Sequence, residues 1–484
     1  MGYLKGFIEF ERIDPEHRPV AERVKDFGEI IGCYTDEQEK IQSGRCMDCG
    51  IPFCMHACPL HNDMPDINQF ACDGKFAEAY QVLSESNNFP EITGRICPAL
   101  CEEGCTLGIH RKSVSIKGIE NKIAEYAFEH GLVKIKTNPD QTFKKVAVVG
   151  SGPAALACAQ QLTRHGHRVT VFEKNDKVGG LLRYGIPDFK LPKEILDRRI
   201  EQMRLEGVTF ETSTIIGSRD KLEKGVHCDA QKEVAGSSLL DEYDAVVLAP
   251  GSETPRDLKL PGRDLEGIYF ALDFLIAQNR ENNGISENPI SVAGKKVAII
   301  GGGETASDCI GVAIRKGAAA VTQIDYHDEL PESVPVSEAW PDWRRIKRTS
   351  TSQEEGCTRL FSTNTTAFEG KKKVSKIKTV KVRWGKNREI TPVEGTENTL
   401  DADVVLIAMG YSHPASVLAS EFSVQTDGRG NLKAEYEGEN AFRTSNPKVF
   451  AAGDGRRGQS LVVYAIAEGR RCAEAVNSFL REEN

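Results

Sequence analysis

The groups best suited to metal chemistry in this chain are seven of the eight cysteines within residues 46–105. They form two closely spaced runs, Cys46-x2-Cys49-x4-Cys54-x3-Cys58-Pro and Cys97-x3-Cys101-x3-Cys105. The first run is close to the ferredoxin run Cys-x2-Cys-x2-Cys-x3-Cys-Pro, in which the last cysteine serves a second cluster. We therefore expect two 4Fe–4S clusters, with Cys58 crossing from the first to the second.

The second cysteine run would complete the two sites, but seven cysteines leave two four-ligand clusters one ligand short. A carboxylate or amide from a nearby helix could fill the vacancy. Two alternatives remain open from spacing alone. One is a single cluster with spare thiols, and the other is structural zinc, which closely spaced cysteines also bind.

A glycine-rich fingerprint follows the expected strand Val146–Val149 and precedes a helix-like run. Its residues are Gly150, Gly152, Pro153, Ala154 and Ala155. Glycines in this strand–turn–helix context let the backbone approach a pyrophosphate at a helix N-terminus. Glu173 ends the next strand, where a carboxylate can bind a ribose hydroxyl. We predict a dinucleotide site.

Segments far from this fingerprint indicate that the dinucleotide is FAD. Gly453-Asp454 follows a late strand and resembles the second FAD contact of two-domain flavoprotein reductases, in which the aspartate binds the ribityl chain. The stretch Gly458–Val463 would run beside the isoalloxazine, and Gly179–Pro187 would border it from the other side. The expected contacts are Gly180, Leu181, Lys190, Gly251, Gly453, Asp454, Gln459, Ser460 and Leu461.

A second fingerprint, Gly301-Gly302-Gly303-Glu304-Thr305-Ala306, follows another apolar strand and predicts a nicotinamide site. Gly410 ends a strand that echoes the one before Gly251, which suggests an internal duplication. Asp325 ends the next strand and suits the free 2′-hydroxyl of NADH. The basic run 344–348 could instead clamp the 2′-phosphate of NADPH. The expected coenzyme is NADPH, with NADH possible.

The remaining cysteines do not form a redox pair of the kind that disulfide-exchanging flavoenzymes use. Cys158 and Cys309 lie in apolar helical stretches and are most simply core residues. A flavin accepts two electrons as hydride and can pass them on singly, which suits iron–sulfur clusters. No catalytic acid or base is evident, so the expected catalytic role of the protein is orientation and tuning.

Composition excludes several other functions. The 484 residues carry a net charge of −9, which disfavours nucleic acid as a partner. No apolar run is long enough to span a membrane, so no membrane partner is expected. The first residues lack a secretory signal, and fourteen cysteines without one indicate reduced thiols. We expect a cytoplasmic protein.

The expected fold is α/β, with two Rossmann-like nucleotide-binding domains preceded by a mostly helical iron–sulfur domain. Amphipathic stretches at Ile67–Leu83 and Ile116–Phe128 are expected helices, and segments 217–242 and 349–373 read as irregular surface excursions. The expected boundaries are 1–140 for the cluster domain, 144–285 and 413–484 for the FAD domain, and 286–412 for the NAD(P)H domain.

Over nearly its whole length the chain resembles the small (beta) subunit of glutamate synthase. The resemblance rests on Arg45–Cys54, Asn88–Glu91, Gly94–Ile109, Gly179–Pro192, Trp340–Trp343 and Gly453–Glu468. It implies electron flow from NAD(P)H through FAD and two low-potential clusters to a large subunit. That subunit would hold FMN and its own iron–sulfur cluster, hydrolyse glutamine and reduce the imine of 2-oxoglutarate.

The resemblance also implies how the ligands divide. One cluster would use Cys46, Cys49, Cys54 and Cys105, and the other Cys58, Cys97, Cys101 and Glu120. Two departures from the family pattern bear on the coenzyme: Glu304 stands where relatives usually carry Asn, and Pro250 where they carry Thr.

Two other readings compete with this one. The same module could belong to another enzyme, such as a ferredoxin-linked NADP oxidoreductase or a pyrimidine-reductase complex. The chain could also be a non-catalytic flavoprotein with zinc in its N-terminal part.

Overall fold

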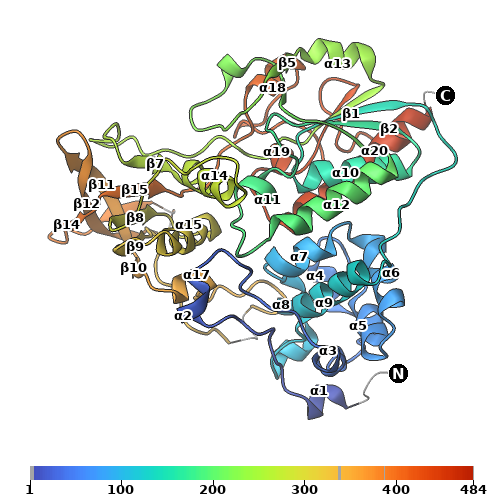
Figure 1. Ribbon diagram of the computed structural model, residues 1–484, viewed down its shortest axis with the longest axis horizontal. Helices are drawn as coiled ribbons and strands as arrows, with labels where there is room; N and C mark the ends of the chain where they lie inside the picture. Colours follow the sequence, from blue (N-terminus) through green and yellow to red (C-terminus); the bar gives the residue numbers. More distant parts are fainter. Residues whose placement is uncertain (1–4, 336–338, 386, 388, 483–484) are drawn as a thin grey trace.

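The computed structural model describes residues 5–335, 339–385, 387 and 389–482. Helices gather in the first 130 residues, and two parallel sheets follow (Figure 1). In the described part of the chain, no helix is long and apolar enough to cross a membrane. The expected α/β class with a helical N-terminal part is confirmed.

Short helices form the N-terminal part because cysteine, proline and glycine interrupt its sequence every few residues. They are α1 (Gly6–Glu9), α2 (Val20–Arg23), α3 (Asp36–Ser43), α4 (Phe53–Ala57), α5 (Met64–Cys72), α6 (Phe76–Ser86), α7 (Pro90–Ile96), α8 (Leu100–Glu103), the 3-10 turn η1 (Thr106–Ile109) and α9 (Ile116–Glu129). The helix expected at Ile116–Phe128 is confirmed. The single helix expected over Ile67–Leu83 is wrong, because Gly74 at φ +73° separates α5 from α6.

The first parallel sheet has the strand order β16-β6-β1-β2-β3. Its strands are β1 (Lys145–Val149), β2 (Arg168–Phe172), β3 (Thr209–Glu211), β6 (Ala245–Leu248) and β16 (Val449–Ala451). Val146 pairs with Val169 of β2 and with Ala245 of β6. Because these strands are covered on both faces, they are continuous apolar runs.

Helices α10 (Pro153–Arg164), α11 (Leu181–Tyr184), α12 (Lys193–Glu206), α13 (Gly236–Glu242), α18 (Val417–Glu421), α19 (Asp454–Arg457) and α20 (Val462–Glu482) accompany the first sheet. Helices α10 and α20 lie side by side (Figure 1). They approach so closely that a Cβ on Gly469 would lie 2.1 Å from the Ala154 carbonyl oxygen. The C-terminal helix therefore supports the first turn of α10.

The second parallel sheet has the order β10-β9-β8-β15-β7. It consists of β7 (Ile268–Phe270), β8 (Lys296–Ile300), β9 (Ala320–Ile324), β10 (Thr358–Leu360) and β15 (Val404–Ile407), with α14 (Ala271–Asn282), α15 (Glu304–Arg315) and α17 (Thr351–Glu354). Strand β7 precedes the expected boundary at residue 285 but pairs with β15. The domain boundaries remain predictions.

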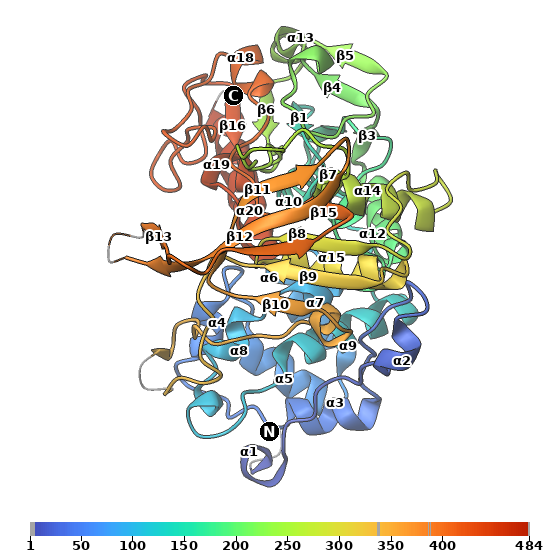
Figure 2. The same cartoon turned by 90° about the vertical axis from the view of Figure 1, so that its left-hand side faces the viewer.

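An antiparallel sheet projects from the second unit (Figure 2). Its strands are β11 (Thr363–Gly370), β12 (Val374–Trp384), β13 (Ile390–Pro392) and β14 (Asn398–Asp401). The expectation that 349–373 is irregular is therefore wrong, because this segment forms α17, β10 and β11. The expectation for 217–242 is also wrong in part, since it contains the 3-10 turn η2 (Arg219–Lys221), β5 (Lys232–Val234), which pairs with β4 (Thr214–Ile216), and α13.

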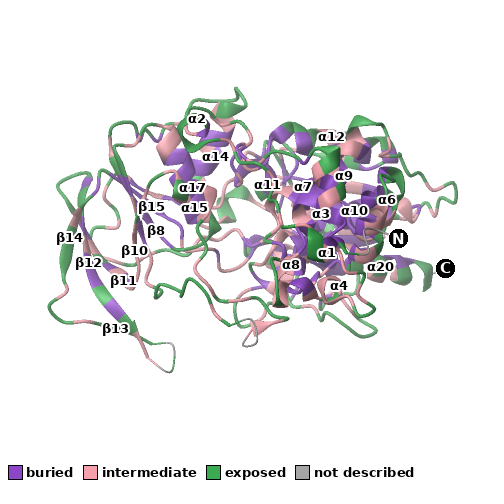
Figure 3. Cartoon of the chain, turned by 90° about the horizontal axis from the view of Figure 1, so that it is seen from below, coloured by how far each residue is buried: buried purple, intermediate pink, exposed green. Residues whose placement is uncertain are grey.

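Buried residues concentrate in the strands and on the inner faces of the helices (Figure 3). Glu39 on α3 departs from this pattern: its carboxyl group is fully buried, and neither oxygen has a hydrogen-bond partner in residues 5–335, 339–385, 387 and 389–482. Burial raises the pKa of Glu39 well above its usual value. Glu39 therefore stays protonated in the folded chain at pH values where it ionises when unfolded.

A Glu39→Met variant is expected to gain stability relative to wild type as the pH rises. The folded-state pKa is the higher one, so the wild-type carboxyl group opposes folding increasingly above its unfolded pKa. The cost is about 1.4 kcal/mol per pH unit until the folded-state pKa is reached. Unfolding midpoints between pH 5 and pH 8 test this, with exposed Glu37→Met as the control. A parallel pH response in both variants would contradict it.

Candidate functional site

The two glycine fingerprints have the same local geometry. Gly150 has φ +101°, and a Cβ on it would lie 2.5 Å from the Ala249 carbonyl oxygen at the end of β6. Gly301 has φ +139°, and its Cβ would lie 2.1 Å from the Ala408 carbonyl oxygen after β15. Only glycine fits at either position. The duplication expected from sequence therefore extends to the backbone contacts.

Each fingerprint ends at a helix that lacks a side-chain cap. Gly152 is the N-cap of α10 and Gly303 the N-cap of α15, and neither helix has a side-chain hydrogen bond at its N-terminus. The first amide groups are thus available to an anion, which the helix dipole also favours. Both helix ends fit a pyrophosphate.

Glu173 lies at the end of β2, beside the first fingerprint. The Ser151 hydroxyl and the Asn175 amide donate to its carboxylate, the latter at 2.8 Å. Burial raises the pKa of Glu173. The carboxylate is held in one orientation at the cavity wall, as ribose recognition requires.

One cavity of about 1030 Å³ connects the two fingerprints. Most of the nucleotide-site residues expected from sequence line it: Gly150, Gly152, Pro153, Ala154, Glu173, Gly180, Leu181, Lys190, Gly251, Gly301, Gly303, Glu304, Thr305, Gly410, Asp454, Gln459, Ser460 and Leu461. Four expected residues lie outside the lining: Ala155, Ala306, Gly453 and Asp325. Asp325 instead lines an adjoining groove.

Lys190 connects the two nucleotide units across this cavity. Its Nζ lies 3.1 Å from Glu304 Oε2 and 2.6 Å from Asp308 Oδ1. Burial alone would lower the pKa of Lys190, but the charges of Asp308 and Glu304 outweigh it and raise that pKa. For the carboxyl group of Asp308, burial has the opposite effect and raises the pKa to about 6. Lys190 thus offsets the negative charge of Glu304 at an otherwise anion-binding helix end.

The cysteines gather in two pockets. Pocket I is lined by Cys46, Cys49, Cys54 and Cys105, and pocket II by Cys58, Cys97, Cys101 and Glu120. The structure therefore brings together the residues of each expected ligand set. In the described residues, no group of His, Cys, Asp or Glu converges closely enough to hold a single metal ion.

The sulfur atoms in these pockets accept hydrogen bonds from nearby amides. The amides of Leu60, His61 and Asn62 donate to Cys58, and the Ala99 amide lies 3.4 Å from the Cys97 sulfur. Hydrogen bonds to ligand sulfurs are a feature of iron–sulfur sites. The donor set therefore fits clusters.

Glu120 enters pocket II from α9 and is fixed by two neighbours. The Asn87 amide donates to its Oε1 at 2.9 Å, and the Thr93 hydroxyl donates to the same oxygen. Burial raises the pKa of Glu120 to about 7. Sequence reasoning missed Asn87 and Thr93, because nothing in their spacing distinguishes them from ordinary helix-flanking residues.

Cys97 lies at the boundary between the two kinds of site. It lines both pocket II and the large cavity. Arg95, Lys117 and Asn121 of the helical part also line that cavity. The helical part therefore supplies one wall of the flavin-type site, which sequence analysis did not predict.

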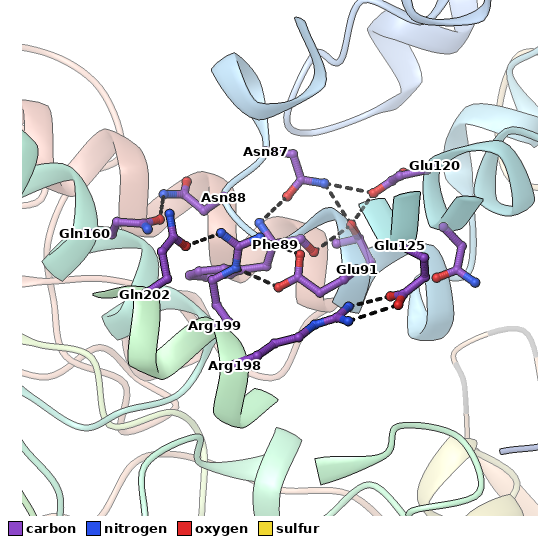
Figure 4. Close-up of polar contacts among 12 residues, drawn as sticks. Asn87, Asn88, Phe89, Glu91, Glu120, Glu125, Gln160, Arg198, Arg199 and Gln202 are labelled. Atoms are coloured by element: carbon purple, nitrogen blue, oxygen red, sulfur yellow. Dashed lines mark hydrogen bonds and ion pairs between the residues drawn. The ribbon is translucent and has the colours of Figure 1, made fainter. Parts of the chain in front are cut away.

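Buried and half-buried polar contacts fix the helical part against the first nucleotide unit (Figure 4). Arg199 on α12 donates through Nε and Nη2 to the two oxygens of Glu91 on α7, both at 2.7 Å. Asn88 donates to Gln160 at 2.7 Å, and Arg198 donates to Glu125 Oε2 at 3.0 Å. Because α7 leads directly to Cys97, these contacts hold pocket II beside the cavity.

Comparison with known proteins identifies the family. Residues 144–469 match the pyridine nucleotide-disulphide oxidoreductase family, and residues 23–132 match dihydropyrimidine dehydrogenase domain II, 4Fe-4S cluster. The glutamate synthase [NADPH] small chain of Mycobacterium tuberculosis is 45% identical, covering 98% of this chain and 95% of the relative. The chain belongs to the glutamate synthase small-chain family.

Other relatives agree with this family, and a solved structure shares the fold. The small chain of Bacillus subtilis glutamate synthase [NADPH] is 38% identical over 99% of both chains. Glutamate synthase [NADH] of Saccharomyces cerevisiae is 38% identical over 99% of this chain and 22% of its own length. FprA from M. tuberculosis in complex with NADPH has a TM-score of 0.51 at 18% identity, covering 70% of this chain and 84% of FprA, and shows the fold alone.

Membership of the small-chain family confirms the resemblance inferred from the motifs. The chain is an oxidoreductase and the electron-input subunit of glutamate synthase. The family matches support FAD and NAD(P) binding and a 4Fe–4S cluster, so they favour iron–sulfur over zinc.

Proposed function

We propose that this small chain uses FAD, NAD(P)H and two 4Fe–4S clusters to supply electrons to a large subunit. We further propose that the large subunit hydrolyses glutamine and contains FMN and its own iron–sulfur cluster. The position of Cys97 between the cavity and pocket II is the observation that carries the proposal. When bound, FAD accepts hydride from nicotinamide and can release electrons singly to clusters.

The proposal also assigns the ligands of the two clusters. Pocket I would hold one cluster through its four cysteines, and pocket II the other through three cysteines and Glu120. Support comes from the grouping of these residues and from the amide hydrogen bonds to their sulfur atoms. The reduced state of the thiols also favours the cytoplasm as the location.

The residues of the large cavity would bind and orient the two nucleotides. The α10 and α15 amide groups would hold their pyrophosphates, and Glu173 would fix a ribose. Asp454, which accepts a hydrogen bond from Ser460, is suited to the ribityl chain. Lys190 would keep Glu304 from repelling the nicotinamide coenzyme. Hydride transfer would then depend on alignment, with no side-chain proton donor.

Anaerobic analysis of the purified chain tests this function. Two 4Fe–4S clusters predict about eight iron atoms and eight acid-labile sulfides per chain. NADPH or NADH should bleach the flavin, and the large subunit should co-purify with the chain. Four iron atoms would contradict the second cluster, and zinc without sulfide would overturn the proposal. Co-purification with a different reductase partner would favour another enzyme built on the same module.

Coenzyme choice depends on the groove beside the second fingerprint. The Asp325 carboxylate lies against Gly302, where an added Cβ would lie 1.8 Å from Oδ2. The basic run 344–348 offers less free positive charge to a 2′-phosphate than its composition suggests, because Arg344 and Arg348 both pair with Glu103. Lys347 pairs with Glu329 and Glu332. A carboxylate thus faces the expected ribose position.

An Asp325→Asn variant is expected to raise kcat/KM for NADPH relative to NADH by about tenfold, because it removes a charge that repels the 2′-phosphate. Steady-state assays with both coenzymes and an artificial acceptor measure the ratio. Asp328→Asn in the same groove is the matched control and should leave the ratio unchanged. An unchanged ratio in Asp325→Asn would place the ribose elsewhere.

A further inference from the structure

Arg45 is a buried positive charge beside pocket I. Its side chain is fully buried and, within the described part of the chain, donates only to backbone carbonyls: to Phe10 at 3.1 Å, Ser113 at 2.9 Å and Lys112 at 2.6 Å. Among the described residues, no carboxylate forms an ion pair with it. Burial lowers the pKa of Arg45, but a guanidinium stays protonated at neutral pH.

A buried charge without a counter-charge is costly, so the folded protein should supply an anion near Arg45. Cys105 of pocket I is a group on which Arg45 acts electrostatically. The carboxylate of Glu11, which also acts on Arg45, is mostly exposed and pairs with Arg111 at 3.4 Å. A thiolate-bound cluster in pocket I carries the negative charge that the guanidinium lacks.

Asn68 adds a second feature to pocket I. This side chain is 1% exposed, lines pocket I and hydrogen-bonds the Cys46 sulfur, while its Oδ1 has no partner among the residues that the structure describes. Backbone amides also donate to three of the four sulfurs of the pocket. Those of Leu107, Gly108 and Val114 donate to Cys105, that of Met55 to Cys54, and that of Asp48 to Cys46.

Pocket II has a more negative and more enclosed environment. Glu120, as the proposed fourth ligand, carries the same charge as a cysteine thiolate, but Cys101 also faces Glu102 outside the ligand set, whose charge Arg12 offsets only in part at 2.7 Å. Cys58 and Cys101 are 5% and 7% exposed, whereas three of the four cysteines of pocket I are half-buried. Nearby negative charge and burial both oppose the addition of an electron.

We propose that pocket I holds the cluster of higher reduction potential and pocket II the cluster of lower potential, with Arg45 supplying the main difference. The inference rests on the proposed function, because both pockets must hold clusters. Electrons that enter beside Cys97 would then move energetically downhill to pocket I. Pro52 of the pocket I lining directly follows Ile51, which is 67% exposed, so the favourable end of the path is near the surface.

Potentiometric EPR titration of the full-length, cluster-loaded chain tests this order. Dithionite and redox mediators set the potential, so NAD(P)H oxidation is not required. Arg45→Met should lower the reduced-to-oxidised ratio of the higher-potential signal by tenfold or more at a fixed potential, which is about 59 mV per tenfold for one electron. Arg45→Lys, which keeps the charge, should restore most of the shift.

Two further variants assign the signals without removing a buried charge. Asn68→Leu should lower the reduction potential of the higher-potential signal and leave that of the other signal unchanged. Thr93→Val removes the hydroxyl that donates to Glu120 and should shift only the lower-potential signal. If Arg45→Met loses iron, Asn68→Leu decides the assignment. The inference is overturned if the variants shift the opposite signals, or if neither reduction potential shifts at full iron content. A chain without clusters would instead contradict the proposed function itself.

Discussion

An Arg199→Met variant is expected to lose about 3–5 kcal/mol of unfolding free energy. Arg199 and Glu91 are both fully buried and joined by two hydrogen bonds at 2.7 Å. Removal of the guanidinium leaves the Glu91 carboxylate without its partner in the interface between α7 and α12. Urea denaturation followed by circular dichroism measures the loss.

The cost should come mainly from the unpaired carboxylate, so an Arg199→Met/Glu91→Leu double variant should recover much of it. Arg204→Met is the matched control, because Arg204 lies on the same helix with its side chain 53% exposed. That change should stay within about 0.5 kcal/mol of wild type. An Arg199→Met chain as stable as the control would show that the ion pair does not hold the two parts together.

A Cys97→Ser variant is expected to separate hydride uptake from electron export. Its sulfur lies on the wall shared by the cavity and pocket II, so its loss should remove one cluster and leave the nucleotide fingerprints intact. Glutamate formation with the large subunit should fall by roughly a hundredfold or more. Reduction of the flavin by NAD(P)H should change by less than about threefold.

Iron content and EPR measure the loss of the cluster, and stopped-flow flavin reduction measures hydride uptake separately. Cys33→Ser is the control, since Cys33 is exposed and lies outside both pockets. This control should retain full iron and full glutamate formation. Normal glutamate formation in Cys97→Ser would mean that electrons leave the flavin by another route.

The nucleotide-binding units were the most predictable part of the fold. The strands expected before the two fingerprints and before Glu173 and Asp325 are all present, because strands buried on both faces are apolar runs bounded by glycine. The antiparallel sheet was not predicted. Strand β12 mixes lysines with buried residues and lies partly in solvent, so its pattern resembles that of a loop.

The candidate site was only partly predictable for a different reason. Spacing predicted clusters, but it left open how Cys97, Cys101 and Cys105 divide between them. That division depends on how α7, α8 and α9 pack, which local sequence does not encode. Arg45 stands directly before the first cysteine, yet its burial and its lack of a carboxylate partner become visible only in three dimensions.

The order of the chain has a consequence for its biosynthesis. Strand β16 pairs with β6 at one side of the first sheet, and α20 supports the first turn of α10, yet both come from residues 449–482. The ribosome must therefore finish the entire second nucleotide unit before the first can close. Until then, α10 lacks the helix that packs against it, so stable retention of the yellow chromophore should be a late event in biosynthesis.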